Sequence, residues 1–451
     1  MSDHHPSRPS GPTRRVVVLA SLASLALGGC SATTGDANVA TTGVTSSARE
    51  VADGSGVWDA SKVHAISVEV DGDAVATMID TYQETDEKEW LEATVTIDGE
   101  TFQRAGIRLK GNSSLRSVSD DSDPTDLPWL IRLDKFVDDQ AVDGSSEFII
   151  RSNSSETALN EAVALDLLAK AGLASEHAVA SSFEVNGSGA RLRLVVQNLD
   201  EDWEAENFST DGLLYKSEAS GDWSYRGDDP DAYTDVFDQE TGDDDLTPLI
   251  DFLDFLNNSS DEYFVSELPS RLDVQSFARY LAFEELVDNF DDIDGPGNNS
   301  YLRYDAETGA FTVVAWDHNL AFGASPGGAG GPGGGFPDGE QPEGMPTDFP
   351  DGQRPEGMPT DFPDGGRPGG GYGGGGGMPG RSNVLVERFT AVEEWADLVE
   401  QAKSDLTDEL IDSGYAEEVL DAWTSVLLEQ AGDLVDATTV QDESDAIRAK
   451  L

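Results

Sequence analysis

The sequence predicts an α+β fold with two lobes, the first rich in strands and the second ending in a helical C-terminal part. Between His64 and Val196, short runs alternate apolar and polar residues, which is typical of half-buried strands. After Leu249, apolar residues recur at the spacing of amphipathic helices. Residues 192–203 (LRLVVQNLDEDW) leave a strand and enter a short linker, which is where a hinge between two lobes is expected.

Turn residues delimit the elements before this linker. Asp98-Gly99 and Asn186-Gly187 each predict a hairpin between the flanking strands. The helix 156–171 is expected to be capped by 153–155 and ended by Gly172. The expected strands are His64–Val70, Leu91–Ile97, Phe102–Lys110, Trp129–Leu133, Glu147–Arg151, Ala178–Val185 and Arg191–Val196; a short helix is expected at Asp73–Tyr82 and a disordered acidic loop at Asp120–Pro128.

After the linker, the expected order is the strand Leu213–Lys216, an acidic loop at 222–245 and helices at Leu249–Leu256 and Val274–Val287. Residues 325–380 are rich in Gly and Pro and repeat the motif FPDG, a composition that predicts disorder. From residue 381 the pattern returns to amphipathic helices, which are expected to complete the same domain as residues 57–324. The expected C-terminal helices are Leu385–Phe389, Val392–Ala402, Leu406–Ser413 and Ala416–Gln430.

The charge restricts the classes of partner. The 451 residues carry a formal net charge of −60, with only 28 Lys and Arg residues. Nucleic acids and anionic lipid surfaces would be repelled by this charge, so neither is expected as a partner.

The N-terminus predicts export. A polar, basic start is followed by the apolar run 16–27, which has the length of the core of a signal peptide. The run ends in Leu-Gly-Gly-Cys30, which resembles the cleavage box of bacterial lipoprotein signal peptides. Cys30 is the single cysteine and has no disulfide partner, so it is expected to carry the lipid. Residues 1–30 are therefore interpreted as the signal segment and 31–56 as a flexible tether. The protein is expected on the outer face of the bacterial cytoplasmic membrane, held by the lipid alone.

The export route stays open at this point. Arg14 and Arg15 permit twin-arginine export as well as the general secretory route.

A small-residue loop follows the strand that ends at Lys110. Backbone N–H groups and hydroxyls in such a loop can bind phosphate, and neighbouring cations would neutralise its charge. An ordinary polar turn is the alternative, but Arg108, Lys110 and Arg116 form a local excess of basic residues in an acidic chain. The loop consists of Gly111, Asn112, Ser113 and Ser114. Glu161, in the helix 156–171, is the best candidate for a carboxylate facing this loop, the alternative being a solvent-exposed helical Glu.

Residues 284–323 combine an acidic turn with a hairpin. The turn leads to Asn299, and the hairpin strands 301–304 and 311–316 deliver Asp317. Carboxylate and amide oxygens suit Mg²⁺, which is held by one or two carboxylates plus substrate phosphates. Asp294 precedes Asn299 by five residues, as the catalytic Asp precedes the metal-binding Asn in phosphotransferases. An acidic hairpin loop without function is the alternative, and Asp291 and Asp292 compete with Asp294 for the catalytic role.

These residues together resemble the CotH family of atypical secreted protein kinases. The resemblance spans about residues 62–323 and extends to the expected C-terminal helices, and its most specific motif is 298–323. The other carriers are RLKGNSS (108–114), NEAVALDLLAKAGL (160–173), VVQNLD (195–200) and LYK (214–216). The resemblance implies a reduced, two-lobed, atypical protein-kinase-like fold. It also implies transfer of the ATP γ-phosphate, with Mg²⁺ or Mn²⁺, to Ser or Thr of secreted or cell-envelope proteins.

The resemblance also implies residue roles. Asp294 would accept the proton of the substrate hydroxyl, and Asn299 and Asp317 would hold the metal. Lys110, with Arg108, would bind the phosphates above 111–114. The basic group paired with Glu161 would be Lys110 or Arg132, and the two alternatives stay open. Gln197 and Lys216 would lie near the hinge, on the nucleotide side.

Two positions depart from the family pattern. Asn319 stands where the family often has a second Asp, and Gln197 stands where a Glu is common. Both departures leave open a nucleotide-binding pseudokinase without transfer activity, or a structural scaffold at the cell surface. A Ca²⁺-binding adhesin is a weaker alternative because 291–294 lacks the spacing of a Ca²⁺ loop. We expect the protein to be a monomer.

Overall fold

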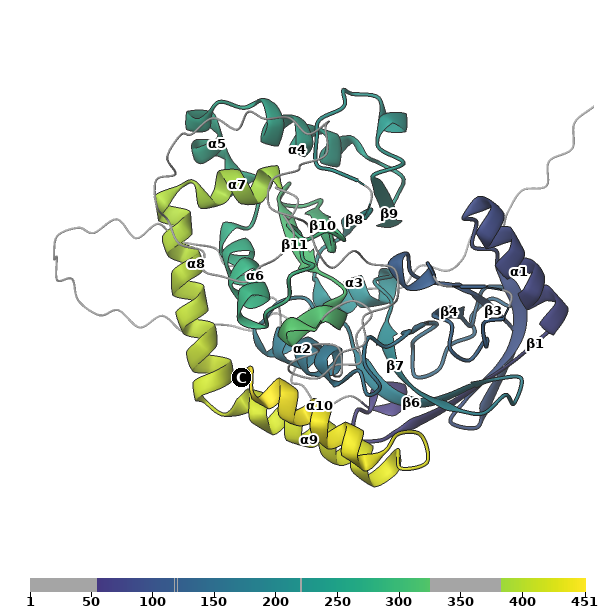
Figure 1. Ribbon diagram of the computed structural model, residues 1–451. Helices are drawn as coiled ribbons and strands as arrows, with labels where there is room; N and C mark the ends of the chain where they lie inside the picture. Colours follow the sequence, from purple (N-terminus) through teal and green to yellow (C-terminus); the bar gives the residue numbers. More distant parts are fainter. Residues whose placement is uncertain (1–54, 117, 120, 220, 325–382) are drawn as a thin grey trace, which may run out of the picture. The chain divides into compact units, whose positions relative to one another are not determined.

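The computed structural model describes residues 55–324, except 117, 120 and 220, and residues 383–451 (Figure 1). The signal segment with Cys30, nearly all of the tether and the Gly/Pro-rich insert lie outside the described residues. Within the described ranges, no helix combines the length and apolar character needed to cross a membrane.

The N-terminal part is a closed barrel with the strand order β1-β2-β3-β4-β5-β7-β6. Neighbouring strands are antiparallel except β1 and β6, whose parallel pairing closes the barrel. Apolar side chains such as Val95, Ile107 and Phe148 fill its interior, and Met78 of the helix α1 packs into the same core. The bounds are β1 His64–Val70, α1 Gly72–Thr85, β2 Leu91–Ile97, β3 Glu100–Leu109, β4 Trp129–Arg132, β5 Glu147–Ile150, β6 Ala178–Val185 and β7 Arg191–Gln197, with short 3-10 turns at Gly56–Trp58 (η1) and Ser113–Leu115 (η2).

The loop before β4 is ordered, so the expectation of disorder between 120 and 128 was wrong for its described residues. The Trp129 indole donates to the Pro124 carbonyl oxygen at 2.8 Å. The guanidinium of Arg193 donates to the carbonyl oxygens of Thr125 at 2.6 Å and Leu127 at 3.1 Å. A buried arginine of β7 therefore holds this acidic loop against the barrel, a long-range contact that local composition does not reveal.

The helix α2, Leu159–Lys170, begins three residues later than the sequence predicted. Its first turn has no side-chain cap at Ala158, whose backbone is left-handed with φ 54°. The preceding residues are bound instead by the carboxylate of Glu443, which accepts from the hydroxyl of Ser155 at 2.7 Å and from the N–H of Glu156 at 3.0 Å. The C-terminal helix α10, Ala437–Arg448, thus fixes the start of α2.

The rest of the described chain is built on a four-stranded sheet with the order β11-β10-β8-β9. The sheet and α2 share one apolar core with the C-terminal helices, and α2 lies against α9 (Figure 1). The strands are β8 Gly212–Ser217, β9 Phe237–Thr241, β10 Ser300–Asp305 and β11 Phe311–Ala315. The helices are α3 Glu201–Asn207, α4 Thr247–Asn258, α5 Asp261–Glu267, α6 Val274–Leu286, α7 Val384–Thr390, α8 Glu393–Leu406 and α9 Tyr415–Gln430, with a π-helical turn at Thr407–Asp412 (η6) and 3-10 turns at Pro230–Ala232 (η3), Leu268–Ser270 (η4) and His318–Gly323 (η5).

A separate apolar cluster joins the barrel to this sheet. It brings Leu130 of β4 and Ile149 of β5 together with Leu214 of β8, Tyr301 of β10 and Trp316, which follows β11. The carboxyl ends of β3 and β5 therefore lie close to the end of the β10–β11 hairpin. The predicted α+β architecture with a helical C-terminal part is confirmed.

Candidate active site

The hairpin β10–β11 delivers two predicted site residues from one end. Ser300 is paired with Ala315 at the open end of the hairpin. Asn299 immediately precedes this pair, and Asp317 follows it by two residues, so both leave the sheet at the same edge. Asp317 has a left-handed backbone with φ 65° and ψ 60°, which turns the chain sharply from the strand into η5. The hairpin and the exit of Asp317 from its last strand are as the sequence predicted.

The partner of Asp317 is Arg151, a residue that the sequence analysis did not single out. The Arg151 guanidinium contacts the Asp317 carboxylate and also pairs with Glu161 of α2 at 2.7 Å. Glu161 is 3% exposed, which excludes a solvent-exposed helical Glu. Arg151 follows the last residue of β5, and it is joined to Glu161 and Asp317 in one partly buried cluster.

The expectation that Lys110 or Arg132 pairs with Glu161 was wrong. Arg132 pairs instead with Asp134 at 2.8 Å and with Glu147 at 3.2 Å. The hydrogen bond to Asp134 is the main cause that raises the pKa of Arg132. The physical reason is the pairing of β4 with β5: Arg132 lies opposite Glu147 in the sheet, so its charge is satisfied within the barrel.

The predicted phosphate loop directly follows β3. Gly111 has φ 116°, and a Cβ there would lie 2.2 Å from the Ser114 hydroxyl oxygen, so the loop requires glycine at this position. The Leu115 N–H donates to the Asn112 carbonyl oxygen at 3.1 Å. Lys88 donates to the Gly111 carbonyl oxygen at 2.6 Å and so brings another cation to the loop.

Four cations gather between the barrel and the second sheet. Burial lowers the pKa of Lys110 to about 8; Glu240 opposes this, and Lys216, Arg108 and Lys88 add to it. Burial also lowers the pKa of Lys88, again with Lys216 and Arg108 contributing. Lysines that repel one another in this way form a positively charged site with the chemistry to bind phosphate.

Carboxylates balance part of this charge. The Lys216 ammonium pairs with Glu218 at 2.7 Å. Burial raises the pKa of Asp238, and the neighbouring Glu218 raises it further. Lys216 is opposite Asp238 in the register of β8 and β9, so β9 supplies the acidic side of this cluster.

Trp316 connects the two charged clusters. Its ring centroid lies 6.0 Å from the Lys110 ammonium and 5.7 Å from the Arg151 guanidinium carbon, both within cation–π range. Arg108 likewise lies over Trp90, at 5.0 Å from the ring centroid. The cations beside 111–114 and the group containing Asp317 are therefore neighbours around one indole ring.

The acidic turn gives its carboxylates different partners. Asp291 accepts from the Gly297 N–H and from the side chain of Asn299; burial nevertheless raises its pKa. Asp294 accepts from the Asn383 N–H at 2.7 Å, and its pKa is also raised by burial. Burial and the nearby Glu284 raise the pKa of Asp292 to about 7.

The same turn is tied to the basic cluster. The Asn298 amide donates to the Glu218 carbonyl oxygen at 3.2 Å, and Glu218 in turn pairs with Lys216. The three predicted groups, at the phosphate loop, at Asp317 and in the acidic turn, are thus linked through described contacts.

The segment after Asp317 is held in place by contacts with α6 and with residues at and before the start of α2. His318 is buried with its Nε2 3.2 Å from a Glu284 carboxylate oxygen. The carbonyl oxygen of Asn319 accepts from the Ser154 hydroxyl at 2.6 Å and from the Asn160 amide at 2.5 Å. The backbone of Asn319, one of the two residues that depart from the family pattern, is therefore held in place by these two hydrogen bonds.

Gln197 is the other residue that departs from the family pattern. It is the last residue of β7, and its side chain bonds neighbouring protein groups. Its side-chain oxygen accepts from the His177 N–H at 3.2 Å, and its amide donates to Glu206 at 3.0 Å. Both ends of the side chain are thus bonded to neighbouring protein groups. The predicted nucleotide contact of Gln197 stays a prediction.

The oxygen donors present suit a hard cation. Asp317 offers a carboxylate and Asn299 an amide oxygen, which is enough for Mg²⁺ when substrate phosphates complete the shell. Among the described residues, no group of three or more His, Cys, Asp or Glu side chains is placed to hold a metal without such phosphates. The chemistry fits a metal that arrives with a nucleotide.

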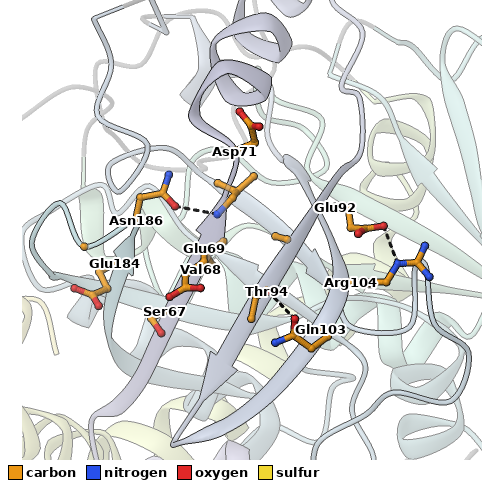
Figure 2. A pocket seen from close by; sticks show the side chains of 13 residues that line it. Ser67, Val68, Glu69, Asp71, Glu92, Thr94, Gln103, Arg104, Glu184 and Asn186 are labelled. Atoms are coloured by element: carbon orange, nitrogen blue, oxygen red, sulfur yellow. Dashed lines mark hydrogen bonds and ion pairs between the residues drawn. The ribbon is translucent and has the colours of Figure 1, made fainter.

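A depression in the barrel contains none of the predicted site residues. It has a volume of about 690 Å³ and lies on the strands β1, β2, β3 and β6 of the barrel (Figure 2). Glu92 and Arg104 pair across it at 2.9 Å, and the Thr94 hydroxyl bonds Gln103 at 3.2 Å. These four side chains thus bond in two pairs.

Two basic residues of the site were missed by the sequence analysis. Arg151 was counted only as the last residue of a strand, yet a basic residue at that point, just before the helix of Glu161, was an available signal. Lys88 lies in the charged run EKEW (87–90), where nothing distinguishes it from an exposed lysine.

The chain is similar in sequence to known proteins over part of its length. A family model described as CotH kinase protein matches residues 107–438, which is more than half of the chain. Inner spore coat protein H of Bacillus subtilis (strain 168) is 26% identical over 167 residues, 36% of this chain and 45% of that protein. The chain thus covers less than half the length of this curated relative. The resemblance carried by the sequence motifs is confirmed, and the chain belongs to the CotH kinase family.

Proposed function

We propose that the protein is an ATP-dependent protein kinase that transfers the γ-phosphoryl group to Ser or Thr of a secreted or cell-envelope protein. Membership of a kinase family implies ATP as the phosphate donor. The observation that carries the proposal is the position of Trp316 between Lys110 and Arg151. It brings the cations of the phosphate loop and the carboxylate of Asp317 into one neighbourhood.

The cations would bind and orient the nucleotide. Lys88 and Lys110, with Arg108, place positive charge beside the loop 111–114, where the phosphates would lie. Phosphoryl transfer is catalysed mainly by positioning and by electrostatic stabilisation of charge on the phosphate oxygens. A partly buried group of cations is suited to both, because charge interactions are stronger where water is excluded.

Asp317 and Asn299 would hold Mg²⁺ or Mn²⁺. The chemistry such a metal would supply is neutralisation of the negative charge on the phosphates. Asp291 bonds the Asn299 side chain, so we assign it as a positioning residue. We assign Asp294 to accept the proton of the acceptor hydroxyl because it lies five residues before Asn299, as the catalytic Asp does in other kinases.

The location follows from the N-terminal sequence. Cys30, after the apolar run 16–27, would carry the lipid and hold the kinase at the outer face of the cytoplasmic membrane. Its acceptor would then be another protein of the cell envelope or a secreted protein.

The test is phosphate transfer by the purified chain. With radiolabelled ATP and Mg²⁺ or Mn²⁺, the wild type should label itself or an added protein acceptor. Asp317→Asn should lower the rate at least about a hundredfold, the usual effect of removing a group that stabilises transition-state charge. Asp421→Asn is the matched control, since Asp421 also pairs with an arginine, at 2.6 Å, but in α9. Equal rates for the Asp317 variant and the wild type would refute the assigned role.

A nucleotide-binding pseudokinase is the second candidate. It is favoured by the contact of Arg151 with Asp317, which already neutralises the predicted metal ligand, and by Asn319 in place of an Asp. Metal-dependent ATP binding without transfer would select this candidate. Failure to bind ATP would select a structural scaffold.

A further inference from the structure

The start of α7 bonds the proposed catalytic carboxylate. The N–H of Asn383 donates to Oδ1 of Asp294 at 2.7 Å, a contact between residues 89 positions apart. Asn383 is buried, and α7 begins directly after it. The proposed base is therefore held by a helix that lies beyond the most specific sequence motif, 298–323.

The N–H of Asn383 takes no part in α7 itself. Asn383 is the N-cap residue, and its side-chain oxygen accepts from the Leu385 N–H at 2.9 Å. Its carbonyl oxygen accepts from the Glu387 N–H at 2.9 Å. The N–H groups at the start of a helix have no partner inside the helix. The N–H of Asn383 is therefore available to a group outside α7, and that group is Asp294.

Donor and acceptor are both anchored to α6. Phe389 of α7 packs edge-on against Phe277 of α6, with ring centroids 4.9 Å apart. In the acidic turn, the N–H of Ile293 donates to the hydroxyl of Tyr280 of α6 at 3.1 Å. All four side chains are buried. The hydrogen-bond donor and the carboxylate therefore keep their relative position, because both segments are packed against one helix.

The hydrogen bond orients the carboxylate and stabilises its charged form. Burial raises the pKa of Asp294, the Asn383 N–H lowers it, and the carboxylate of Glu387 raises it. Asp292 in the turn and the Tyr280 hydroxyl on α6 also interact electrostatically with Asp294. Among the described residues, Oδ2 of Asp294 has no hydrogen-bond donor, so this oxygen is left to accept a proton.

We propose that the start of α7 is part of the active site and that Asn383 is a positioning residue for the proposed base. Its backbone N–H fixes one carboxylate oxygen of Asp294, so that the other oxygen faces the hydroxyl of the acceptor. The inference rests on the proposed kinase function and extends the catalytic machinery beyond the segment 284–323.

Two substitutions at residue 383 separate the effect of the N–H from that of the side chain. Asn383→Ala and Asn383→Pro both remove the side-chain cap of α7, but only the proline also removes the N–H. The backbone φ of Asn383 is −86°, close to the value that proline requires, and the carbonyl oxygen that accepts from Glu387 is kept. The difference between the two variants therefore measures the hydrogen bond to Asp294.

Phosphate transfer is measured over a range of pH, with radiolabelled ATP and the acceptor that the wild type labels. Relative to Asn383→Ala, Asn383→Pro should lower kcat about tenfold, because the base is no longer oriented, and leave the KM for ATP unchanged. The lost N–H raises the pKa of Asp294, so the base stays protonated to a higher pH. The acidic limb of the kcat profile should therefore move up by about one pH unit, which a change in stability alone would not cause.

Glu387 provides a test of opposite sign. Its side chain is exposed, so Glu387→Gln should not disturb folding. Removing its charge should lower the pKa of Asp294 and move the acidic limb to lower pH. This shift should be smaller than that of the proline variant, because an exposed charge is screened. Glu394→Gln is the matched control, since it removes the same charge from an exposed position on α8 and should leave the profile unchanged.

The outcomes distinguish this inference from the proposed function. If the wild type transfers phosphate and the two variants at 383 share one kcat and one pH profile, the positioning role is refuted and the kinase function stands. If circular dichroism shows that Asn383→Pro does not fold, Glu387→Gln decides: an acidic limb at the wild-type pH refutes the inference, and one at lower pH supports it. If the wild type transfers phosphate neither to itself nor to any added protein, the proposed function fails, and the inference fails with it.

Discussion

Lys110 offers a test of the phosphate site that does not depend on the acceptor. In the free protein it is one of four neighbouring cations, and its pKa falls from the ordinary lysine value of 10.5 to about 8 because of burial and these neighbours. The charge on such a residue destabilises the fold. Lys110→Met keeps the aliphatic stem and removes the charge, so it should stabilise the free protein and weaken nucleotide binding.

The magnitude follows from the pKa. A tenfold change in proton affinity corresponds to about 1.4 kcal/mol, so lowering the pKa from 10.5 to about 8 sets an upper bound of about 3–4 kcal/mol on the cost of the charge. Lys110 keeps some contact with solvent, which screens the repulsion. We therefore expect Lys110→Met to raise the free energy of unfolding by about 1–2 kcal/mol at pH 7.

The sign of the pH dependence is specific. Below pH 8 the lysine is charged in both the folded and the unfolded chain, so the full penalty is present. Between pH 8 and 10.5 the unfolded chain binds more protons than the folded one, so the wild type gains stability as the pH rises. The advantage of Lys110→Met should therefore be largest at pH 7 and decline between pH 8 and 10.5.

Urea unfolding at several pH values measures this difference, and titration calorimetry with ATP and Mg²⁺ measures binding. Lys62→Met is the matched control, because Lys62 is 42% exposed and pairs with Asp98 on the barrel. A Lys110 variant less stable than the wild type at pH 7 would refute the reasoning, and so would a stability gain that does not vary with pH. Unchanged ATP affinity would remove Lys110 from the phosphate site.

Three further predictions concern the groups around Lys110. Glu161→Gln should lower the free energy of unfolding by about 1–3 kcal/mol in urea titrations, since one charged hydrogen-bond partner of Arg151 is lost. Glu443→Gln should cost a similar amount, because Ser155 and the start of α2 lose a charged acceptor. In transfer assays, Asp294→Asn should lower kcat with little change in the KM for ATP, whereas Asp291→Asn should raise the KM for ATP and Mg²⁺; the reverse pattern would exchange their assigned roles.

Much of the secondary structure was predictable because it depends on local pattern. Every barrel strand shows alternation or a short apolar run, and β1, β2 and β6 were predicted with their observed bounds. The strand β9 was missed because its sequence, FDQET, lies inside an acidic segment and has few apolar residues. The start of α2 was misplaced because the residues before it are held by Glu443, far along the chain.

The site was predictable in its residue types and only partly in its pairing. The loop 111–114 and Asp317 carry local motifs, so their chemistry could be predicted without the fold. The partner of Glu161 could not be predicted, because it depends on which barrel strand ends beside α2. The closure of the barrel places Arg151 there and leaves Arg132 paired within the barrel.

This pairing bears on the choice between kinase and pseudokinase. Arg151 is shared by Glu161 and Asp317, so the carboxylate of Asp317 is balanced by a cation before any metal is considered. A metal and the guanidinium compete for that carboxylate, since both are positive. Glu161 offers Arg151 another carboxylate 2.7 Å away, so Arg151 can leave Asp317 and remain paired in a partly buried site. Glu161 therefore lowers the cost of separating Arg151 from Asp317, because the guanidinium keeps a carboxylate partner. The contact of Arg151 with Asp317 is compatible with an active kinase.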